Sequence, residues 1–94
     1  MSITRINDFR AAPGREQALR EFLQSVIALI EGSAGCLEVV LLADQESADH
    51  LVIVEKWESV AAHQEAAKRI PPDKIAEVGK LLAGPPSGRT YSPA

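Results

Sequence analysis

The chain has 94 residues, of which 46% are hydrophobic and 24% are charged, and its formal net charge is −3. This length predicts a single domain, residues 1–94, with enough apolar material for one core. The acidic balance argues against the strongly basic face that phosphate neutralisation requires, so we expect no nucleic-acid partner.

The first half of the chain predicts one strand followed by one helix. Residues 2–9 are rich in β-branched side chains and are typical of a strand, which the Ala-Ala-Pro-Gly stretch at 11–14 ends. From residue 15 to residue 30, apolar side chains recur at every third or fourth position, which indicates an amphipathic helix of about four turns. Gly32 and Gly35 end this helix.

The second half predicts a hairpin, two short helices and a last strand. Residues 36–43 and 50–57 are apolar runs separated by a polar loop, as in a β-hairpin. Ser59 is a candidate N-cap for a helix over 60–69, which Pro71-Pro72 ends. Residues 73–83 predict a further helix, and residues 89–93 predict an edge strand.

The order of these elements is β-α-β-β-α-β with one extra short helix. It predicts an α+β fold, a ferredoxin-like sandwich with a four-stranded antiparallel sheet whose helices cover one face. The run over 50–57 nevertheless has apolar side chains on both faces, with Leu51 and Ile53 on one and Val52 and Val54 on the other. A sheet with one face in water should instead alternate apolar and polar residues.

This two-sided pattern predicts a homodimer. The chain has no third layer to cover the second face, and each large aliphatic side chain left in water forgoes about 1.5–3 kcal/mol. A second copy that packs sheet on sheet removes this cost. The alternative is a modest apolar patch exposed to water.

Several short motifs follow one another in a fixed order along the chain. They are Pro13-Gly14, Gly35-Cys36-Leu37, Glu55-x-Trp57, Ser59 with Ala62 and His63, and Pro85-Pro86 ahead of a last strand that contains Tyr91. Their order and spacing resemble the antibiotic biosynthesis monooxygenase (ABM) domain family over nearly the whole chain. No single motif would carry this resemblance alone.

The resemblance implies a dimeric α+β barrel, in which two ferredoxin-like sheets pack face to face. Family members of known activity include cofactor-free monooxygenases that convert anthrone-like or hydroquinone-like aromatics into quinones. Other members degrade haem or act on small signalling molecules. The haem-degrading branch carries a second tryptophan and an iron-binding histidine, where this chain has residues near Ala66 and Ala76, so the resemblance implies no haem.

Three candidate site residues lie around the end of the run 50–57. Glu55 and Trp57 share a strand parity and point to one face. Glu55 is a candidate catalytic carboxylate, or it has a structural role as an acceptor for hydrogen bonds. Trp57 either closes the end of the core or forms a surface on which an aromatic substrate stacks. His63, early in the following helix, is a candidate general base or an ordinary surface histidine.

Three further candidates lie on the outer strands. The amide of Asn7 on the first strand could stabilise an oxyanion, and oxygenases of the resembled family use an asparagine in this strand. Arg89 and Tyr91 on the last strand are candidate substrate-binding residues, with decoration of a sheet edge as the alternative.

We expect neither a metal nor another cofactor. No metal-ligand motif occurs, and His50 and Trp57 stand about 23 Å apart along one strand, so His50 and His63 should not converge. The single cysteine, Cys36, is most simply a small buried hydrophobe. No apolar run approaches the ~18 residues of a membrane span and no signal peptide is evident, so we expect a cytoplasmic protein without a membrane partner.

The leading hypothesis is an enzyme that oxidises a small electron-rich aromatic with O₂. Two alternatives remain, a non-catalytic module that binds a small apolar ligand and an isomerase or lyase that acts on a small carbonyl metabolite. Polar groups that converge on one cavity would favour an enzyme. A cavity lined only by aliphatic side chains would favour simple binding.

Overall fold

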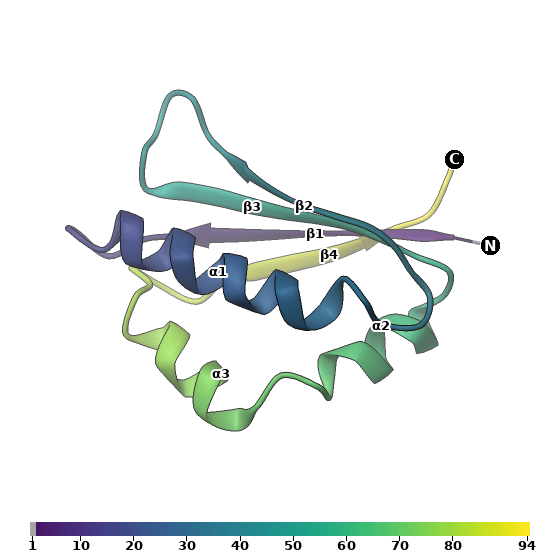
Figure 1. Cartoon of the computed structure of the whole chain (residues 1–94). Coiled ribbons are helices and arrows are strands. Elements are labelled where there is room, and N and C mark those ends of the chain that lie inside the picture. Colours follow the sequence, from purple (N-terminus) through teal and green to yellow (C-terminus); the bar gives the residue numbers. More distant parts are fainter. Residues whose placement is uncertain (1) are drawn as a thin grey trace.

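A computed structural model describes residues 2–94 and confirms the α+β sandwich. The elements in chain order are β1 (Ile3–Arg10), α1 (Glu16–Ile30), β2 (Cys36–Ala43), β3 (His50–Trp57), α2 (Val60–Ala67), α3 (Pro72–Gly79) and β4 (Ser87–Tyr91). The strands form one antiparallel sheet in the order β2-β3-β1-β4. All three helices lie on one side of this sheet (Figure 1), as in ferredoxin-like folds.

Two boundaries predicted near the C-terminus are wrong. The helix predicted over 73–83 ends at Gly79, because the chain then extends so that Leu82 bridges to Ala11 and the Ala83 N–H donates to the Arg10 carbonyl at 2.8 Å. The last strand covers 87–91 instead of 89–93, since Pro93 has no N–H to continue the ladder.

The ends of two other elements also differ from the prediction by one or two residues. The first strand extends to Arg10, which pairs with His50, and α2 ends at Ala67 rather than at residue 69. The predicted N-cap of α2 is confirmed, because the Ser59 hydroxyl accepts the Ala62 N–H at 3.1 Å.

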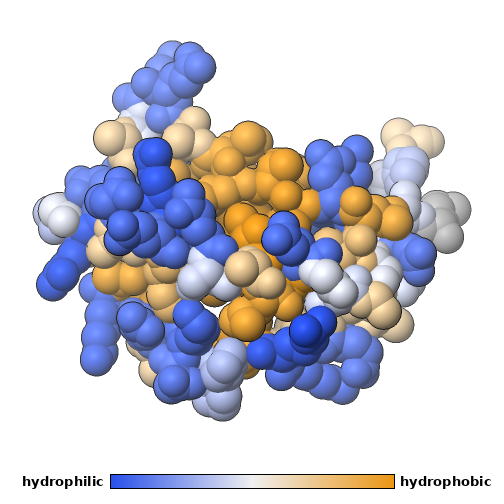
Figure 2. Space-filling model, in the orientation of Figure 1, coloured by the Kyte–Doolittle hydropathy of each residue, from blue (hydrophilic) through white to orange (hydrophobic). Residues whose placement is uncertain are grey.

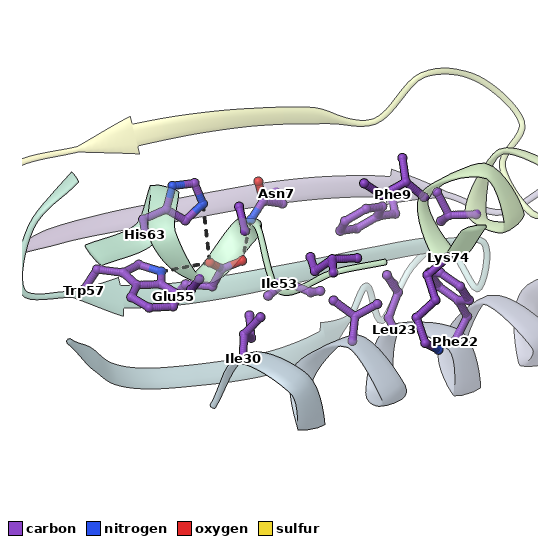
Figure 3. Close-up of a pocket in the computed structure, with 16 residues that line it drawn as sticks. Asn7, Phe9, Phe22, Leu23, Ile30, Ile53, Glu55, Trp57, His63 and Lys74 are labelled. Carbon is purple, nitrogen blue, oxygen red and sulfur yellow. Dashed lines mark hydrogen bonds and ion pairs between the residues drawn. The ribbon is translucent and has the colours of Figure 1, made fainter. Parts of the chain in front are cut away.

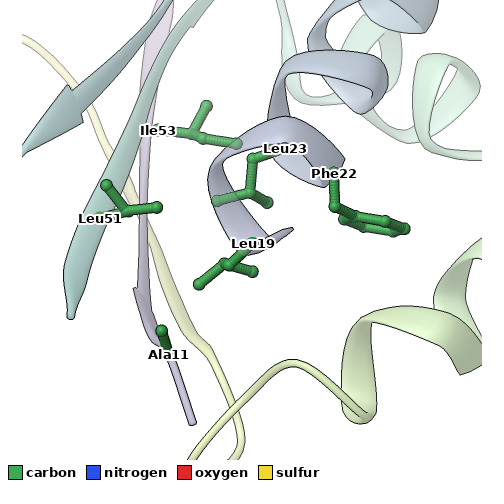
Figure 4. Close-up of a cluster of buried hydrophobic side chains, with 6 residues drawn as sticks. All are labelled: Ala11, Leu19, Phe22, Leu23, Leu51 and Ile53. Atoms are coloured by element: carbon green, nitrogen blue, oxygen red, sulfur yellow. The ribbon is translucent and has the colours of Figure 1, made fainter. Parts of the chain in front are cut away.

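The core fills the space between α1 and the sheet. Its larger cluster comprises Ala11, Leu19, Phe22, Leu23, Leu51 and Ile53 (Figure 4). The helix residues of this cluster recur at three- and four-residue spacing, and the β3 residues alternate, so each element contributes its apolar face. A second cluster comprises Ile3, Ile30, Trp57 and Ala66. Trp57 has no exposed surface and closes this end of the core.

Gly35 allows the α1–β2 connection to approach α2 closely. Its φ of +83° lies in the left-handed region, and a Cβ at this position would lie 2.5 Å from the Ala62 Cβ. The Gly35 carbonyl also accepts the Glu58 N–H at 2.8 Å. A glycine is therefore required here both by conformation and by space.

The face of the sheet opposite the helices is uncovered in the single chain (Figure 1). Strand register aligns Val40, Val54 and Ile6 in one row of this face and Leu42 with Val52 in the next. The same rows end in polar side chains, among them Arg89 and Asp8. The two-sided apolar pattern predicted for the central strands is thus present.

Within residues 2–94, no helix combines the length and apolar character needed to cross a membrane.

Candidate functional site

A cavity of about 220 Å³ lies between the helices and the covered face of the sheet. Most of its wall is apolar and comes from both layers, for example from Phe9, Phe22, Val26, Ile30, Ile53 and Val78. Figure 2 shows apolar atoms gathered in the middle of this side of the molecule, framed by hydrophilic ones. Four side chains with titratable or amide groups interrupt the apolar wall: Asn7, Glu55, His63 and Lys74.

Glu55 is the central polar group of the cavity. It is only 6% exposed, and each of its carboxylate oxygens accepts one hydrogen bond from a neutral donor. The Trp57 Nε1–H donates to Oε1 at 2.9 Å, and the Asn7 Nδ2–H donates to Oε2 at 2.8 Å (Figure 3). These two bonds offset part of the desolvation cost of the buried carboxylate and fix its position.

Arg5 fixes the orientation of the Asn7 amide. Its Nη2 donates to Asn7 Oδ1 at 3.0 Å, and its Nη1 donates to Thr90 Oγ1 at 3.1 Å. A guanidinium can only donate and an ionised carboxylate can only accept, so Asn7 must present its oxygen to Arg5 and its nitrogen to Glu55. No acceptor within the described part of the chain takes the second Nδ2 hydrogen, which remains available to a ligand.

Gly88 provides the space for this arrangement. It pairs with Asn7 across the β1–β4 ladder. A Cβ at position 88 would lie 2.5 Å from both Arg5 Nη2 and Asn7 Oδ1. The contact between Arg5 and Asn7 therefore depends on the absence of a side chain at position 88.

His63 reaches the same group from α2. Its Nε2 lies 4.0 Å from Glu55 Oε1, and its ring meets the edge of Trp57 with the centroids 5.7 Å apart. Burial lowers the pKa of His63, the negative charge of Glu55 opposes this shift, and the positive charge of Arg5 adds to it. The imidazole is therefore neutral near pH 7 and can accept a proton, after which Glu55 stabilises the imidazolium.

Four of the predicted site residues meet in this cavity, namely Asn7, Glu55, Trp57 and His63. The structure separates the other two, Arg89 and Tyr91, from this group. They pair with Ile6 and Thr4, and residues of this parity face away from the helices. Both side chains therefore lie on the uncovered face of the sheet.

Trp57 fills the first of its two expected roles, that of a core residue, because it is fully buried. Its indole N–H also holds the Glu55 carboxylate that lines the cavity. Its role as a platform for an aromatic substrate stays a prediction.

The two histidines do not converge, as expected from their separation along the chain. His50 contacts Asp8 Oδ1 through Nε2 at 2.7 Å and Asp44 Oδ2 through Nδ1 at 2.9 Å, outside the cavity. The described residues contain no group of three or more side chains placed to hold a metal ion.

Cys36 is partly buried rather than fully buried and packs near Trp57. Burial, followed by the negative charges of Glu55 and Glu31, raises the pKa of its thiol. The thiol therefore stays protonated, which does not favour a role as a nucleophile.

Two residues of the site were missed from the sequence. Arg5 shares the strand parity of Asn7, so the alternation within β1 could have revealed it. Lys74 offers no such signal, because the side of α3 that meets the cavity depends on how that helix packs.

Comparison with known proteins places these observations in a family. The family described as "Antibiotic biosynthesis monooxygenase" matches residues 2–69. No functionally curated protein matches the chain.

Solved structures share the whole fold. Rv0793 from Mycobacterium tuberculosis is 26% identical with a TM-score of 0.88, covering 100% of this chain and 96% of that chain. PA3566 from Pseudomonas aeruginosa is 25% identical with a TM-score of 0.83, covering 99% and 95%. SnoaB from Streptomyces nogalater, described as a cofactor-independent oxygenase, has a TM-score of 0.83 over 98% and 92% of the chains. At 14% identity, the likeness to SnoaB concerns the fold alone.

Proposed function

The chain belongs to the antibiotic biosynthesis monooxygenase family, and we propose that its cavity oxidises a small electron-rich phenol with O₂ and without a cofactor. The observation that carries the proposal is the convergence of Asn7, Glu55 and His63 on one end of an otherwise apolar cavity. Converging polar groups support an enzyme rather than a simple binding module. The description of SnoaB, a protein of the same fold, as a cofactor-independent oxygenase agrees with this chemistry.

The size of the cavity supports a substrate of one or two fused rings. Its volume of about 220 Å³ exceeds the ~150 Å³ of a cavity that accommodates benzene. It falls below the ~300 Å³ at which pockets for drug-sized ligands begin. A naphthol or a substituted phenol therefore suits the cavity better than a three-ring anthrone.

Proton removal is the first step that we propose. A neutral His63 accepts the phenolic proton, and Glu55, 4.0 Å from its Nε2, stabilises the resulting imidazolium. The mostly apolar wall lowers the local dielectric constant, which strengthens the interaction between these two charges. The substrate is left as an electron-rich phenolate.

Oxygen transfer follows from the phenolate itself. The phenolate gives one electron to O₂, and the two radicals join in a C–O bond at the ring carbon para to the oxygen. The peroxide takes the proton from the His63 imidazolium and becomes a hydroperoxide. The same ring carbon then loses its hydrogen to His63 as a proton, the O–O bond breaks, and the departing hydroxide takes this proton back from His63 to become water. One oxygen atom ends in the quinone and the other in water, so the substrate supplies all four electrons. The second N–H of Asn7 stabilises the peroxide anion.

The assembly that we propose is a homodimer formed through the uncovered face of the sheet. The rows that contain Val40, Val54 and Ile6 form an apolar centre with a polar rim, which is the composition of a protein–protein interface. Arg89 and Tyr91 would then contact the partner copy rather than the substrate.

Oxygen consumption by the metal-stripped protein tests this function. We expect uptake above the buffer blank with phenols whose para carbon bears a hydrogen, such as 1-naphthol or 1,5-dihydroxynaphthalene, and little uptake with anthrones. His63→Gln should lose most of the activity, whereas His50→Gln, which alters a histidine on the other face, should retain it. Binding of these compounds without oxygen uptake would instead support the non-catalytic alternative.

A further inference from the structure

Lys74 marks the end of the cavity opposite Glu55. Figure 3 shows Lys74 and Phe22 at one end and Trp57, Glu55 and His63 at the other. Lys74 is half-buried as a residue, and its ammonium lies 5.2 Å from the centroid of the Phe22 ring. It also donates to Ser25 Oγ at 2.9 Å, while the Ser25 hydroxyl donates to the Phe22 carbonyl. The charge is thus held at a defined place, beside Phe22 and Ser25, at this end of the cavity.

The fold itself gives this charge no anionic partner. Within residues 2–94, no carboxylate lies within ion-pair distance of the Lys74 ammonium. Lys74 also lies in the first turn of α3, where the helix dipole disfavours a positive charge. A half-buried cation with neutral contacts alone gains from an anion that enters the cavity.

We propose that the substrate carries a carboxylate on the side remote from the ring that is oxidised, and that Lys74 binds this carboxylate. This inference rests on the function proposed above. Glu55 at one end repels an anionic group and Lys74 at the other attracts it, so the two charges select one of the two orientations of a flat ligand. In that orientation the phenolic hydroxyl lies beside His63.

The dimensions of the cavity agree with a two-ring acid. Phe9, which Figure 3 shows toward the Lys74 end, pairs with Leu51 on β3. Leu51 precedes Glu55 by four residues, which corresponds to about 13 Å along the strand. A naphthol with a carboxylate on its second ring, with one hydrogen bond at each end, has a comparable length.

Anaerobic binding tests the inference separately from turnover. The probes are a naphthol with a carboxylate on the second ring and the matching carboxamide, and the readout is the fluorescence of Trp57, the single tryptophan. The wild type should bind the acid about tenfold more tightly than the amide, because a hydrogen bond to a charged group is involved. Lys74→Met should remove this preference, and Lys74→Arg should retain it.

Lys80→Met is the matched control, because Lys80 lies at the end of the same helix and outside this cavity. It should leave the preference for the acid unchanged. Equal binding of acid and amide by the wild type, or an unchanged preference in Lys74→Met, would overturn the role of Lys74. Aerobic turnover of the unsubstituted naphthol would then still support the proposed oxidation. The opposite result is a preference for the acid that depends on Lys74, without any turnover. It would contradict the proposed oxidation and still support carboxylate binding by Lys74.

Discussion

Asn7 and Glu55, which are 48 positions apart in the sequence, are joined by a 2.8 Å hydrogen bond between neighbouring strands. This bond is one link of a chain that starts at Arg5, passes through the Asn7 amide and ends at the carboxylate of Glu55. Each hydrogen bond in this series can form in only one donor-to-acceptor direction. The cavity therefore presents an oriented amide and an anchored carboxylate before any ligand binds. Such preorganisation is what oxyanion stabilisation requires.

Gly88→Ala should weaken catalysis without unfolding the protein. The added Cβ lies 2.5 Å from Arg5 Nη2 and Asn7 Oδ1, so the guanidinium must move and its bond to Asn7 is lost. We expect kcat to fall about five- to tenfold, the usual effect of one lost hydrogen bond. Gly84→Ala, whose added Cβ meets nothing within 4 Å, is the control. Turnover of Gly88→Ala at the wild-type rate would mean that Arg5 does not position Asn7.

Gly35→Ala should destabilise the fold itself. Its left-handed φ and the 2.5 Å approach to Ala62 Cβ together predict a loss of about 2–4 kcal/mol in the free energy of unfolding. Urea denaturation measures this loss. Gly32→Ala, with no atom near the added Cβ, should change the stability by much less. Equal effects of the two substitutions would contradict the close packing of the α1–β2 connection on α2.

His50 should make the stability depend on pH. Hydrogen bonds to Asp44 first and Asp8 second raise the pKa of His50 above its ordinary value of 6.5. Its contribution is therefore complete below the unfolded pKa and is lost as the pH rises through the folded pKa. In denaturation series from about pH 6 to about pH 9, the stability difference between wild type and His50→Gln should shrink as the pH rises. A difference that stays constant over this range would rule out the stabilising imidazolium.

Val54→Lys should separate the proposed dimer into monomers. Val54 lies between Val40 and Ile6 in the apolar row of the uncovered face, where an interface would bury a lysine without a partner. Sedimentation at micromolar concentration should find a dimer for the wild type and a monomer for the variant. Gln64→Lys, an equal change of charge on an exposed position of α2, should remain dimeric. A monomeric wild type would contradict the proposed assembly.

Periodicity along the chain was enough to predict the sheet, its hairpin and the long helix. The apolar residues of α1 and β3 recur at the spacing of their elements, and tertiary packing preserves this spacing. The same alternation correctly predicted that Glu55 and Trp57 share a face. Alternation did not predict which face of the sheet the β4 side chains occupy. This strand lies at an exposed edge and has no apolar pattern that would show which of its residues point inward.

The remaining features of the site depend on packing between elements. Only the paired register of β1 with β3 and β4 brings Asn7 beside Glu55 and Gly88. The short α3 ends where Leu82 bridges to Ala11, a long-range contact that local propensity does not contain. Lys74 enters the cavity wall for the same reason, since the placement of α3 against α1 decides which of its residues face inward.

The fate of isotopically labelled oxygen tests whether O₂ is transferred directly to the substrate at this site. A single turnover of a naphthol under ¹⁸O₂ by the metal-stripped protein, followed by mass spectrometry of the quinone, reports where each oxygen atom goes. We predict one labelled oxygen atom in the quinone with the wild type and with His50→Gln, and almost no product with His63→Gln. A quinone whose new oxygen comes from water, or equal yields from all three proteins, would contradict direct oxygen transfer at this site.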